Sequence, residues 1–172
     1  GMSSLLYHVH RPTMVKEIEE PIDLRPKIAV DRNITSRMLK GFEATPKDDF
    51  LDARTPLLVN NDIVISVAAP RKSLTEYFYK NVDADELIFV HQGRGRLKTF
   101  LGEIPFEYGD YLVIPRGMIY QIEFENEDNR LLISESFHPI YTPKRYRNWF
   151  GQLLEHSPFC ERDYKLPQNL PT

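Results

Sequence analysis

The sequence has very little cysteine and no long apolar run. Cys160 is the single cysteine among 172 residues, so no disulfide can form within the chain, which fits a reducing compartment. No run of about 18 apolar residues is present to span a membrane, and the start lacks the apolar core of a secretory signal. The formal net charge is only −3, which predicts no strong attraction to nucleic acid or to an anionic membrane. We therefore expect a cytoplasmic protein that binds neither.

Common catalytic and binding motifs are missing as well. The sequence contains no serine-nucleophile motif, no glycine loop that cradles phosphate and no CxxC zinc pair. The Gly93-Arg94-Gly95 run is not followed by the helix that a dinucleotide site requires. Cys160 follows Pro158 and Phe159 with no obvious base nearby, so a structural thiol is favoured over a reactive one.

What the sequence does contain is a series of short strand-like runs. The stretch from Asp85 to Tyr120 has three apolar or mixed runs that are bounded by glycine and too short for typical helices. Their β-branched and aromatic residues predict a tight antiparallel meander. Similar runs before and after it, including two around a turn at 60–62, bring the total to about eight to ten strands. Because no helices are interleaved, the pattern favours an all-β sandwich or barrel.

The pattern changes near both ends of the chain. Residues 1–22 are predicted to form an N-terminal arm, residues 23–137 the barrel, and residues 138–172 an amphipathic helix with an extended linker tail. Thr142 is a candidate N-cap and Pro143 a suitable first helical residue. The apolar residues that recur at helical spacing are Tyr146, Trp149, Phe150, Leu153 and Leu154. We expect Trp149 and Phe150 to pack against the barrel, with a partner-binding stripe as the alternative.

The spacing of glycine and proline in the meander is distinctive. Glu86 precedes Gly93 by seven residues, and Gly109 precedes Pro115 by six, with Gly117 two residues later. This resembles the two motifs of the cupin superfamily, whose fold is a small double-stranded β-helix or jelly-roll barrel. The resemblance implies an inner wall on which three histidines and one glutamate hold a metal ion.

Most of those metal ligands are absent here. Glu86 stands at the glutamate position and Tyr120 at the histidine position of the second motif. The two histidine positions of the first motif fall on Lys80 and Val82, or on Tyr79 and Asn81 if the spacing is one residue longer. A divalent transition metal requires several imidazole or carboxylate donors. We therefore expect a barrel that binds no catalytic metal.

Three segments resemble a narrower family. DELIFVHQG, GDYLVIPRG and QLLEHSPFCERD are similar to the N-terminal half of homogentisate 1,2-dioxygenase in its bacterial form, and the resemblance covers most of residues 7–167. It implies an enzyme of tyrosine and phenylalanine catabolism that opens the ring of a small aromatic substrate with non-haem Fe(II). The iron ligands of that family lie in a second barrel, so none falls on a residue of this sequence. The implied partners are that second cupin half of the same chain and further copies in a homo-oligomer.

Three residues are candidate ligand-binding positions in this barrel: Glu86, His91 and Tyr120. Glu86 could be a surviving acid, although a carboxylate paired with Arg96 or Arg116 is favoured. Tyr120 could donate its hydroxyl to a small ligand, although filling the space of a lost metal site, with its hydroxyl bonded to a neighbour, is favoured.

His91 alternates with Leu87 and Phe89, so we expect it to face the interior as a core histidine rather than as a base.

Two alternatives to the dioxygenase half stay open. The first is a stand-alone, metal-free cupin that binds a small ligand at the barrel mouth, and it is distinguished by whether the natural chain continues beyond Thr172. The second is a single-barrel metalloenzyme that uses His8, His10 and His91. His8 and His10 would share one face of a strand, but they have no carboxylate partner nearby in sequence. This alternative predicts bound metal that is lost on His8→Ala or His91→Ala.

Overall fold

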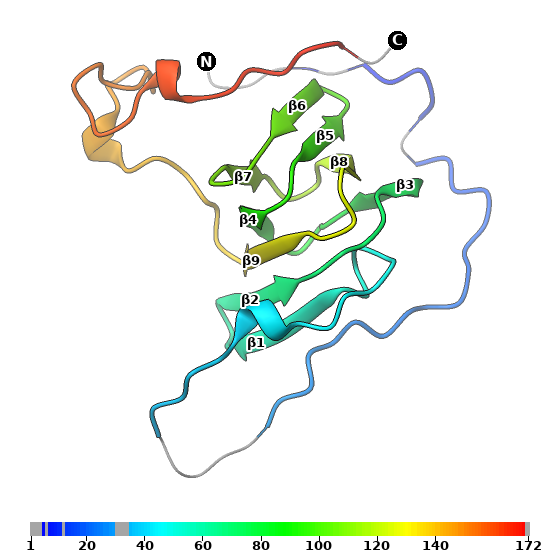
Figure 1. The fold of residues 1–172 in the computed structure, drawn as a ribbon. Helices are drawn as coiled ribbons and strands as arrows, with labels where there is room; N and C mark the ends of the chain where they lie inside the picture. Colours follow the sequence, from blue (N-terminus) through cyan, green and yellow to red (C-terminus); the bar gives the residue numbers. More distant parts are fainter. Residues whose placement is uncertain (1–4, 6, 12, 30–34, 171–172) are drawn as a thin grey trace.

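The computed structural model describes residues 5, 7–11, 13–29 and 35–170. Nine strands and three short 3-10 helices lie in this part of the chain (Figure 1). The strands are β1 (Arg54–Val59), β2 (Ile63–Ala68), β3 (Leu74–Lys80), β4 (Asp85–Gln92), β5 (Gly95–Thr99), β6 (Gly102–Phe106), β7 (Tyr111–Ile114), β8 (Ile119–Phe124) and β9 (Arg130–Ser136). The 3-10 helices are η1 (Gly41–Glu43), η2 (Lys144–Tyr146) and η3 (Glu161–Asp163).

The strands form two antiparallel sheets. One sheet has five strands in the order β1-β2-β9-β4-β7, and the other has four in the order β3-β8-β5-β6. Strands that are adjacent in one sheet are often far apart in sequence, as β9 is from β2 and β4. This is the jelly-roll arrangement of an all-β cupin, as the sequence predicted. The two sheets do not join into one closed barrel of hydrogen-bonded strands, however.

The core lies between the two sheets, and strand alternation fills it. In β4 the side chains of Glu86, Ile88 and Val90 are fully buried, while those of Leu87 and Phe89 lie on the other face and are only half-buried. Because side chains alternate between the two faces of a strand, the burial of one residue fixes which residues of the whole strand face the core. The apolar core comes from both sheets and from Phe50, which precedes β1. Its members in the sheets are Ala68, Leu74, Ile88, Val90, Leu97, Phe106, Leu112, Ile114, Tyr120, Ile122, Leu131 and Ile133.

The glycines of the second cupin-like motif stand at tight turns. Gly109 has φ +90° and Gly117 has φ +81°, a region that residues with a Cβ rarely adopt. The backbone N–H of Gly117 donates to the carbonyl of Asn81 at 2.7 Å, so this turn closes against the end of β3.

The predicted turn between β1 and β2 is confirmed, because the Asn60 side chain accepts the backbone N–H groups of Asp62 and Ile63.

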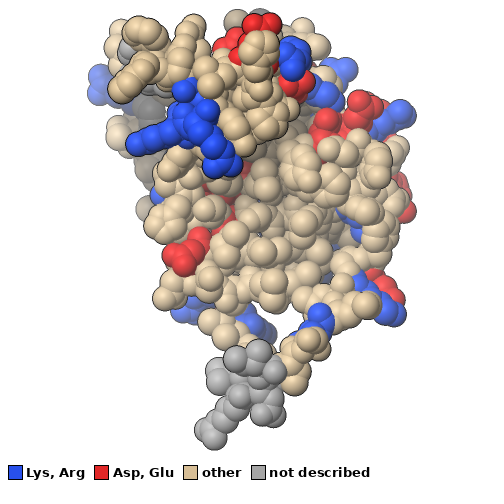
Figure 2. Space-filling model, turned by 90° about the vertical axis from the view of Figure 1, so that its left-hand side faces the viewer, with Lys and Arg blue, Asp and Glu red and all other residues tan. Residues whose placement is uncertain are grey.

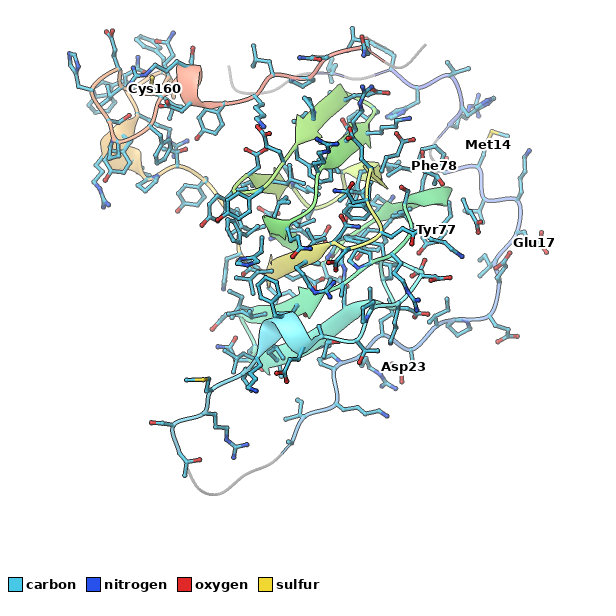
Figure 3. All side chains as sticks on the ribbon, in the orientation of Figure 1. Met14, Glu17, Asp23, Tyr77, Phe78 and Cys160 are labelled. Atoms are coloured by element: carbon cyan, nitrogen blue, oxygen red, sulfur yellow. The ribbon has the colours of Figure 1, made fainter. Side chains whose placement is uncertain are left out.

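The N-terminal arm runs beside the sheets without joining them as a strand. Its described residues between positions 5 and 29 are mostly exposed, and Figure 3 shows Met14, Glu17 and Asp23 lying away from the strands. Between this arm and β1 the described residues hold η1 and an isolated bridge from Lys47 to Pro70 but no strand, so the strands of the jelly roll occupy residues 54–136.

The prediction of an α-helix after Thr142 is wrong. The described chain has no α-helix there, only the single turn η2. The Asn148 side-chain oxygen accepts the backbone N–H groups of Phe150 and Gln152, and Gly151 adopts φ +86°. These local hydrogen bonds replace the backbone hydrogen bonds that a helix would form, and the chain reverses its direction here. Among the described residues no helix is long and apolar enough to cross a membrane.

The aromatic residues at this turn do not pack on the barrel, contrary to expectation. The Trp149 side chain is fully exposed, and Phe150 is 81 % exposed. In an α-helix both would have shared one apolar face, but the turn directs them into solvent.

The last described residues run along the edge of the four-stranded sheet. Gln168 exchanges two backbone hydrogen bonds with Glu103 of β6, each 2.7 Å long. Lys165 pairs with Asp110, its Nζ 2.5 Å from the carboxylate oxygen. The tail was predicted to be extended, and here it covers the otherwise open edge of β6 (Figure 1).

Asp85 attaches the segment that follows β9 to the sheets. One carboxylate oxygen accepts the backbone N–H of Arg116 at 3.0 Å, and the other accepts that of Ile140 at 2.7 Å. Burial opposes the charged form, but the hydrogen bonds from Arg116 and Ile140 outweigh it and hold the pKa of Asp85 below its usual value.

Replacing Asp85 with asparagine is expected to lower the free energy of unfolding at pH 7 by about 1–3 kcal/mol. Because the folded-state pKa is depressed, this stabilisation is present above the unfolded value near pH ~3.9 and is lost as the pH falls through the folded pKa. Urea unfolding at neutral and strongly acidic pH measures the difference, with the exposed Asp83→Asn as control. An equal deficit for Asp85→Asn at both pH values would contradict this role.

Candidate functional site

A buried cluster of polar side chains lies between the two sheets, and it includes Glu86 and Tyr120, which the sequence placed at ligand positions of the cupin-like motifs. Glu86 projects inward from β4 and is fully buried. Arg54 reaches it from β1, and its Nη1 donates to Glu86 Oε1 at 2.6 Å. The Tyr120 hydroxyl, from β8, donates to Glu86 Oε2 at 2.7 Å and accepts from Arg54 Nη2 at 3.2 Å. Each of these three side chains thus contacts the other two.

Other groups close around the guanidinium of Arg54. Glu135 Oε1, from β9, lies 3.6 Å from Arg54 Nη1 and accepts a hydrogen bond from Asn81 Nδ2 at 2.8 Å. The guanidinium carbon lies 4.6 Å from the ring centre of Phe50 and 5.3 Å from that of Tyr79. A cation between aromatic faces and carboxylates is well stabilised, although it is nine-tenths buried.

The structure decides between the two spacings that the sequence left open. Tyr79 and Asn81 contact the cluster, whereas Lys80 and Val82 are exposed. The one-residue longer spacing therefore holds. The four positions that carry metal ligands in the cupin motifs are occupied by Tyr79, Asn81, Glu86 and Tyr120. Tyr79, Glu86 and Tyr120 contact the guanidinium of Arg54, and Asn81 bonds to Glu135 beside it.

The charges of this cluster stabilise one another. Burial alone would lower the pKa of Arg54, but the neighbouring Tyr120 and Glu86, with further contributions from Tyr79 and Glu135, raise it above its ordinary value. Burial raises the pKa of Tyr79 to about 12 and that of Tyr120 well above its usual value. Both phenols are therefore neutral at physiological pH, and the guanidinium is charged.

These residues do not fit a catalytic Fe(II) centre. Neutral phenols and an amide replace the imidazoles, and a permanent cation already satisfies Glu86. Across the described part of the chain, no three His, Cys, Asp or Glu side chains are grouped closely enough to hold a metal ion. The cluster can instead hold the two sheets in register, because its members come from strands of both.

The prediction that Glu86 pairs with Arg96 or Arg116 is wrong. Arg116 pairs with Asp85, and Arg96 pairs with Glu103 at 3.4 Å. Arg54 was missed because β1 is separated from β4 by two strands in the sheet. No local sequence pattern indicates that the Arg54 side chain reaches Glu86 across them. The only available signal was the requirement that a buried carboxylate be paired with a cation.

His91 does not face the interior. Leu87, Phe89 and His91 lie on the outer face of the five-stranded sheet, and His91 is exposed. Its ring packs edge-on against Phe42 of η1 at 4.5 Å and lies 6.0 Å from Phe89. It therefore takes no part in the buried cluster.

The alternative metal site of three histidines is not assembled. His8 packs edge-on against Phe100, which follows β5 of the four-stranded sheet, at 6.2 Å between ring centres. His91 lies on the outer face of the other sheet. His8 of the arm therefore lies against one sheet and His91 belongs to the other, while His10 is exposed in the arm.

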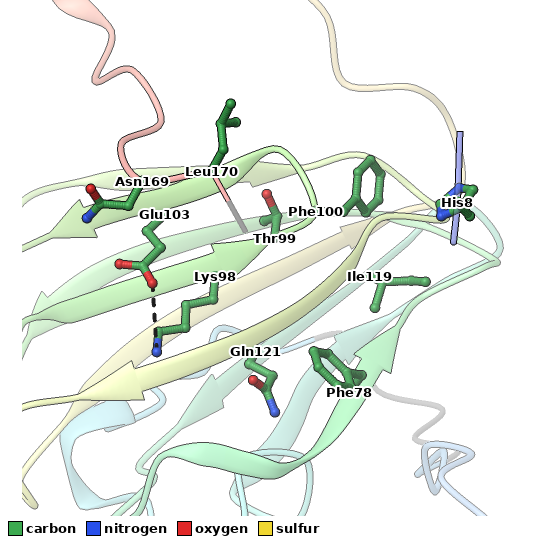
Figure 4. A pocket seen from close by; sticks show the side chains of 10 residues that line it. All are labelled: His8, Phe78, Lys98, Thr99, Phe100, Glu103, Ile119, Gln121, Asn169 and Leu170. Atoms are coloured by element: carbon green, nitrogen blue, oxygen red, sulfur yellow. Dashed lines mark ion pairs between the residues drawn. The ribbon is translucent and has the colours of Figure 1, made fainter. Parts of the chain in front are cut away.

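An open cavity of about 470 Å³ lies on the outer side of the four-stranded sheet rather than between the sheets (Figure 4). Lys98 and Glu103 supply its charged groups, and they lie 3.8 Å apart as an ion pair (Figure 4). Its remaining lining residues are His8, Phe78, Thr99, Phe100, Ile119, Gln121, Asn169 and Leu170. None of the three candidate residues predicted from sequence lines it, so this cavity and the buried cluster are separate features.

One solved structure in particular has the same fold. A Ralstonia eutropha protein described as a mannose-6-phosphate isomerase is 17% identical and superposes with a TM-score of 0.51, over 59% of this chain and 98% of its own. A cupin-2 domain protein from Shewanella frigidimarina is 19% identical, with a TM-score of 0.42, over 48% of this chain and 78% of its own.

Comparison of sequences identifies the family. A protein of Saccharolobus solfataricus that is named as a dioxygenase is 35% identical over 167 residues, which is 97% of this chain and 43% of the relative. The homogentisate 1,2-dioxygenase of Pseudomonas entomophila is 28% identical over 76% of this chain and 32% of its own. This chain thus spans less than half the length of either relative. The family model described as the N-terminal part of homogentisate 1,2-dioxygenase matches residues 48–145. The chain therefore belongs to the homogentisate 1,2-dioxygenase N-terminal family.

Proposed function

We propose that this chain is the iron-free cupin half of a homogentisate 1,2-dioxygenase-like enzyme. In this proposal the ring-opening chemistry, with its Fe(II) and its small aromatic substrate, belongs to a second cupin half of the same protein. This half supports that site and the assembly of the oligomer in the cytoplasm. The family match and the dioxygenase relatives support the assignment.

The observation that carries the proposal is the position of Arg54. Its guanidinium is bonded to Glu86 and Tyr120, at the place where a cupin metal would be bound by those same two positions. Two cations cannot share this space, since like charges repel strongly at short distance in a buried site. A half that has replaced its metal by a side chain retains the fold without the redox chemistry.

The test is the activity of the complete product of the gene. We expect its reading frame to continue beyond Thr172 into a second barrel with histidines and a glutamate, and this product to consume dioxygen with homogentisate when Fe(II) is supplied. The 172-residue chain alone is expected to consume none. A longer product that contains such a barrel but does not turn over homogentisate would contradict the proposed substrate.

The competing function is a stand-alone cupin that binds a small ligand, and the cavity beside Lys98 and Glu103 is the observation that favours it. It requires a natural chain that stops near Thr172. Such a result would remove the dioxygenase proposal and leave ligand binding as the function to be tested.

A further inference from the structure

The cavity on the outer side of the four-stranded sheet has walls from three parts of the chain. Strands β3, β5, β6 and β8 form its floor, His8 of the arm contributes one wall, and Asn169 and Leu170 of the tail contribute another. The tail is held there because Gln168 exchanges two backbone hydrogen bonds with Glu103 of β6. The cavity volume of about 470 Å³ is within the range of about 300–1,000 Å³ that small-molecule sites span.

Three polar side chains, Lys98, Glu103 and Gln121, form a row across this floor. Lys98 of β5 stands directly opposite Glu103 of β6 on one side and Gln121 of β8 on the other, so the cross-strand register places all three on one face. Lys98 Nζ lies 3.8 Å from Glu103 Oε1 and 2.6 Å from Glu123 Oε1. The hydrogen bond to Glu123 raises the pKa of Lys98, so its ammonium group is charged at neutral pH.

The polar row retains hydrogen-bonding capacity for a ligand. Lys98 has three N–H donors, and its 3.8 Å separation from Glu103 is longer than a hydrogen bond. Glu103 Oε1 accepts no hydrogen bond from any described residue, because Arg96 donates to the other carboxylate oxygen at 3.4 Å. The amide nitrogen of Gln121 donates to two backbone carbonyls of β3, which leaves its amide oxygen as an acceptor.

Apolar side chains lie beside the polar row. Phe100 and Ile119 are each two positions in sequence from a member of the row, and both line the cavity. Phe78 of β3 is 71 % exposed there, and Leu170 of the tail is 74 % exposed. Figure 4 shows the rings of Phe78, Phe100 and His8 towards one end of the cavity and the charged pair towards the other. A ligand with an aromatic group would cover this exposed apolar surface.

The charges on the floor of the cavity are balanced. Arg96 pairs with Glu103 at 3.4 Å and Lys98 pairs with Glu123 at 2.6 Å, so two cations stand beside two carboxylates. Such grouping is not found everywhere on the surface, since the side of the molecule in Figure 2 has few charged side chains at its centre. Because the charges cancel, the site does not favour a ligand that carries a net charge of either sign.

We propose that this cavity binds a free α-amino acid with an aromatic side chain, whose carboxylate meets Lys98 and whose ammonium group meets Glu103. A ligand with only a carboxylate would place its charge beside Glu103 and Glu123, and one with only an amine would place its charge beside Lys98. A zwitterion meets an opposite charge at both of its ends. The aromatic ring then lies against Phe78 and Phe100, where offset or edge-on ring contacts are favourable.

This inference names a ligand for the cavity on which the competing function relies, but it requires neither that function nor the iron-free assignment. The cavity lies on the outer side of the four-stranded sheet, whereas the buried cluster around Arg54 lies between the two sheets. The amino-acid site is therefore compatible with a stand-alone cupin and with one half of a longer enzyme.

The test titrates the isotopically labelled 172-residue chain with L-phenylalanine and follows its backbone amides by two-dimensional NMR. We expect saturable shifts of the amides of Lys98, Thr99 and Gln121, with a dissociation constant below about 1 mM. Three related compounds each lack one part of the ligand: phenylpropionate lacks the ammonium group, phenethylamine lacks the carboxylate and L-alanine lacks the ring. Each is expected to bind at least about tenfold more weakly than L-phenylalanine.

Substitutions in the polar row test the same contacts from the side of the protein. Lys98→Met and Glu103→Gln are each expected to weaken L-phenylalanine binding at least about tenfold, because each removes a charge that the zwitterion meets. Lys72→Met is the matched control, since it removes a lysine that is paired with Asp48 at 2.6 Å outside the cavity, and it is expected to change nothing. Amide spectra of the free variants establish that each is folded, and Phe78→Ala, at an exposed position, replaces any that is not.

The absence of saturable shifts up to about 10 mM L-phenylalanine would overturn the inference. Equal or tighter binding of phenylpropionate or phenethylamine would also overturn it, because a single charge would then be sufficient. Shifts confined to residues outside the cavity, or unchanged binding by the cavity variants, would have the same consequence. None of these results would affect the iron-free assignment, which dioxygen uptake by the complete gene product tests separately.

Discussion

Replacing Arg54 with methionine is expected to lower the free energy of unfolding by about 3–5 kcal/mol, because it leaves a fully buried carboxylate without its cation. Methionine keeps much of the side-chain volume, so a cavity contributes little to this loss. Urea unfolding at neutral pH measures the effect. The control is Arg96→Met, which removes an exposed arginine from its pair with Glu103 and is expected to cost less than about 1 kcal/mol.

A double-mutant cycle separates the ion pair from other effects of the substitution. Glu86→Gln leaves a buried guanidinium without its carboxylate, so it is also expected to be destabilising. The variant with both changes is expected to lose less than the sum of the two, with a coupling energy of about 1–3 kcal/mol. If Arg54→Met cost no more than Arg96→Met, the cluster could not be what holds the two sheets together.

The second large effect is the recovery of a metal site. A variant with Arg54→Ala, Tyr79→His, Asn81→His and Tyr120→His keeps Glu86 and gains three imidazoles at the cupin ligand positions. Three imidazoles and a carboxylate suit Co²⁺, Zn²⁺ or Fe²⁺. We expect this variant to bind Co²⁺ with a visible absorption band, and the wild type to bind none.

Thermal unfolding gives an independent measurement of the same site. A metal at a hundred times its dissociation constant should stabilise the folded variant by about 2.7 kcal/mol and should not stabilise the wild type. The matched control adds Glu86→Gln, which removes the carboxylate ligand and is expected to weaken binding. A variant that is folded by circular dichroism but shows no metal-dependent change would mean that Arg54 does not stand at a former metal position.

Much of the fold follows from local sequence signals. The glycines at 109 and 117 identify turns that only glycine adopts easily, and the short apolar runs between turns identify strands. The motif spacing also located Glu86 and Tyr120, two members of the buried cluster. These signals succeed because a turn or a strand is determined mainly by its own residues.

The wrong predictions concern residues whose positions depend on contacts with residues far away in sequence or on competing hydrogen bonds. Arg54 pairs with Glu86 only because the sheet order brings β1 within reach, and no pattern near either residue encodes that. Alternation in β4 shows which residues share a face of the strand. Because both faces of β4 are apolar, it does not show which face is buried, and His91 was therefore assigned to the wrong face. The expected helix after Thr142 was lost to hydrogen bonds of the Asn148 side chain with the backbone, which compete with helix formation.

The most direct measurement is the iron content of the purified 172-residue chain after anaerobic incubation with Fe(II) and desalting. With the guanidinium of Arg54 bonded to Glu86 and Tyr120, we predict far less than one iron per chain, and no change on Glu86→Gln. About one iron per chain, lost on Glu86→Gln, would show that a metal displaces Arg54. That result would contradict the claim that this cupin half has replaced its metal with a side chain.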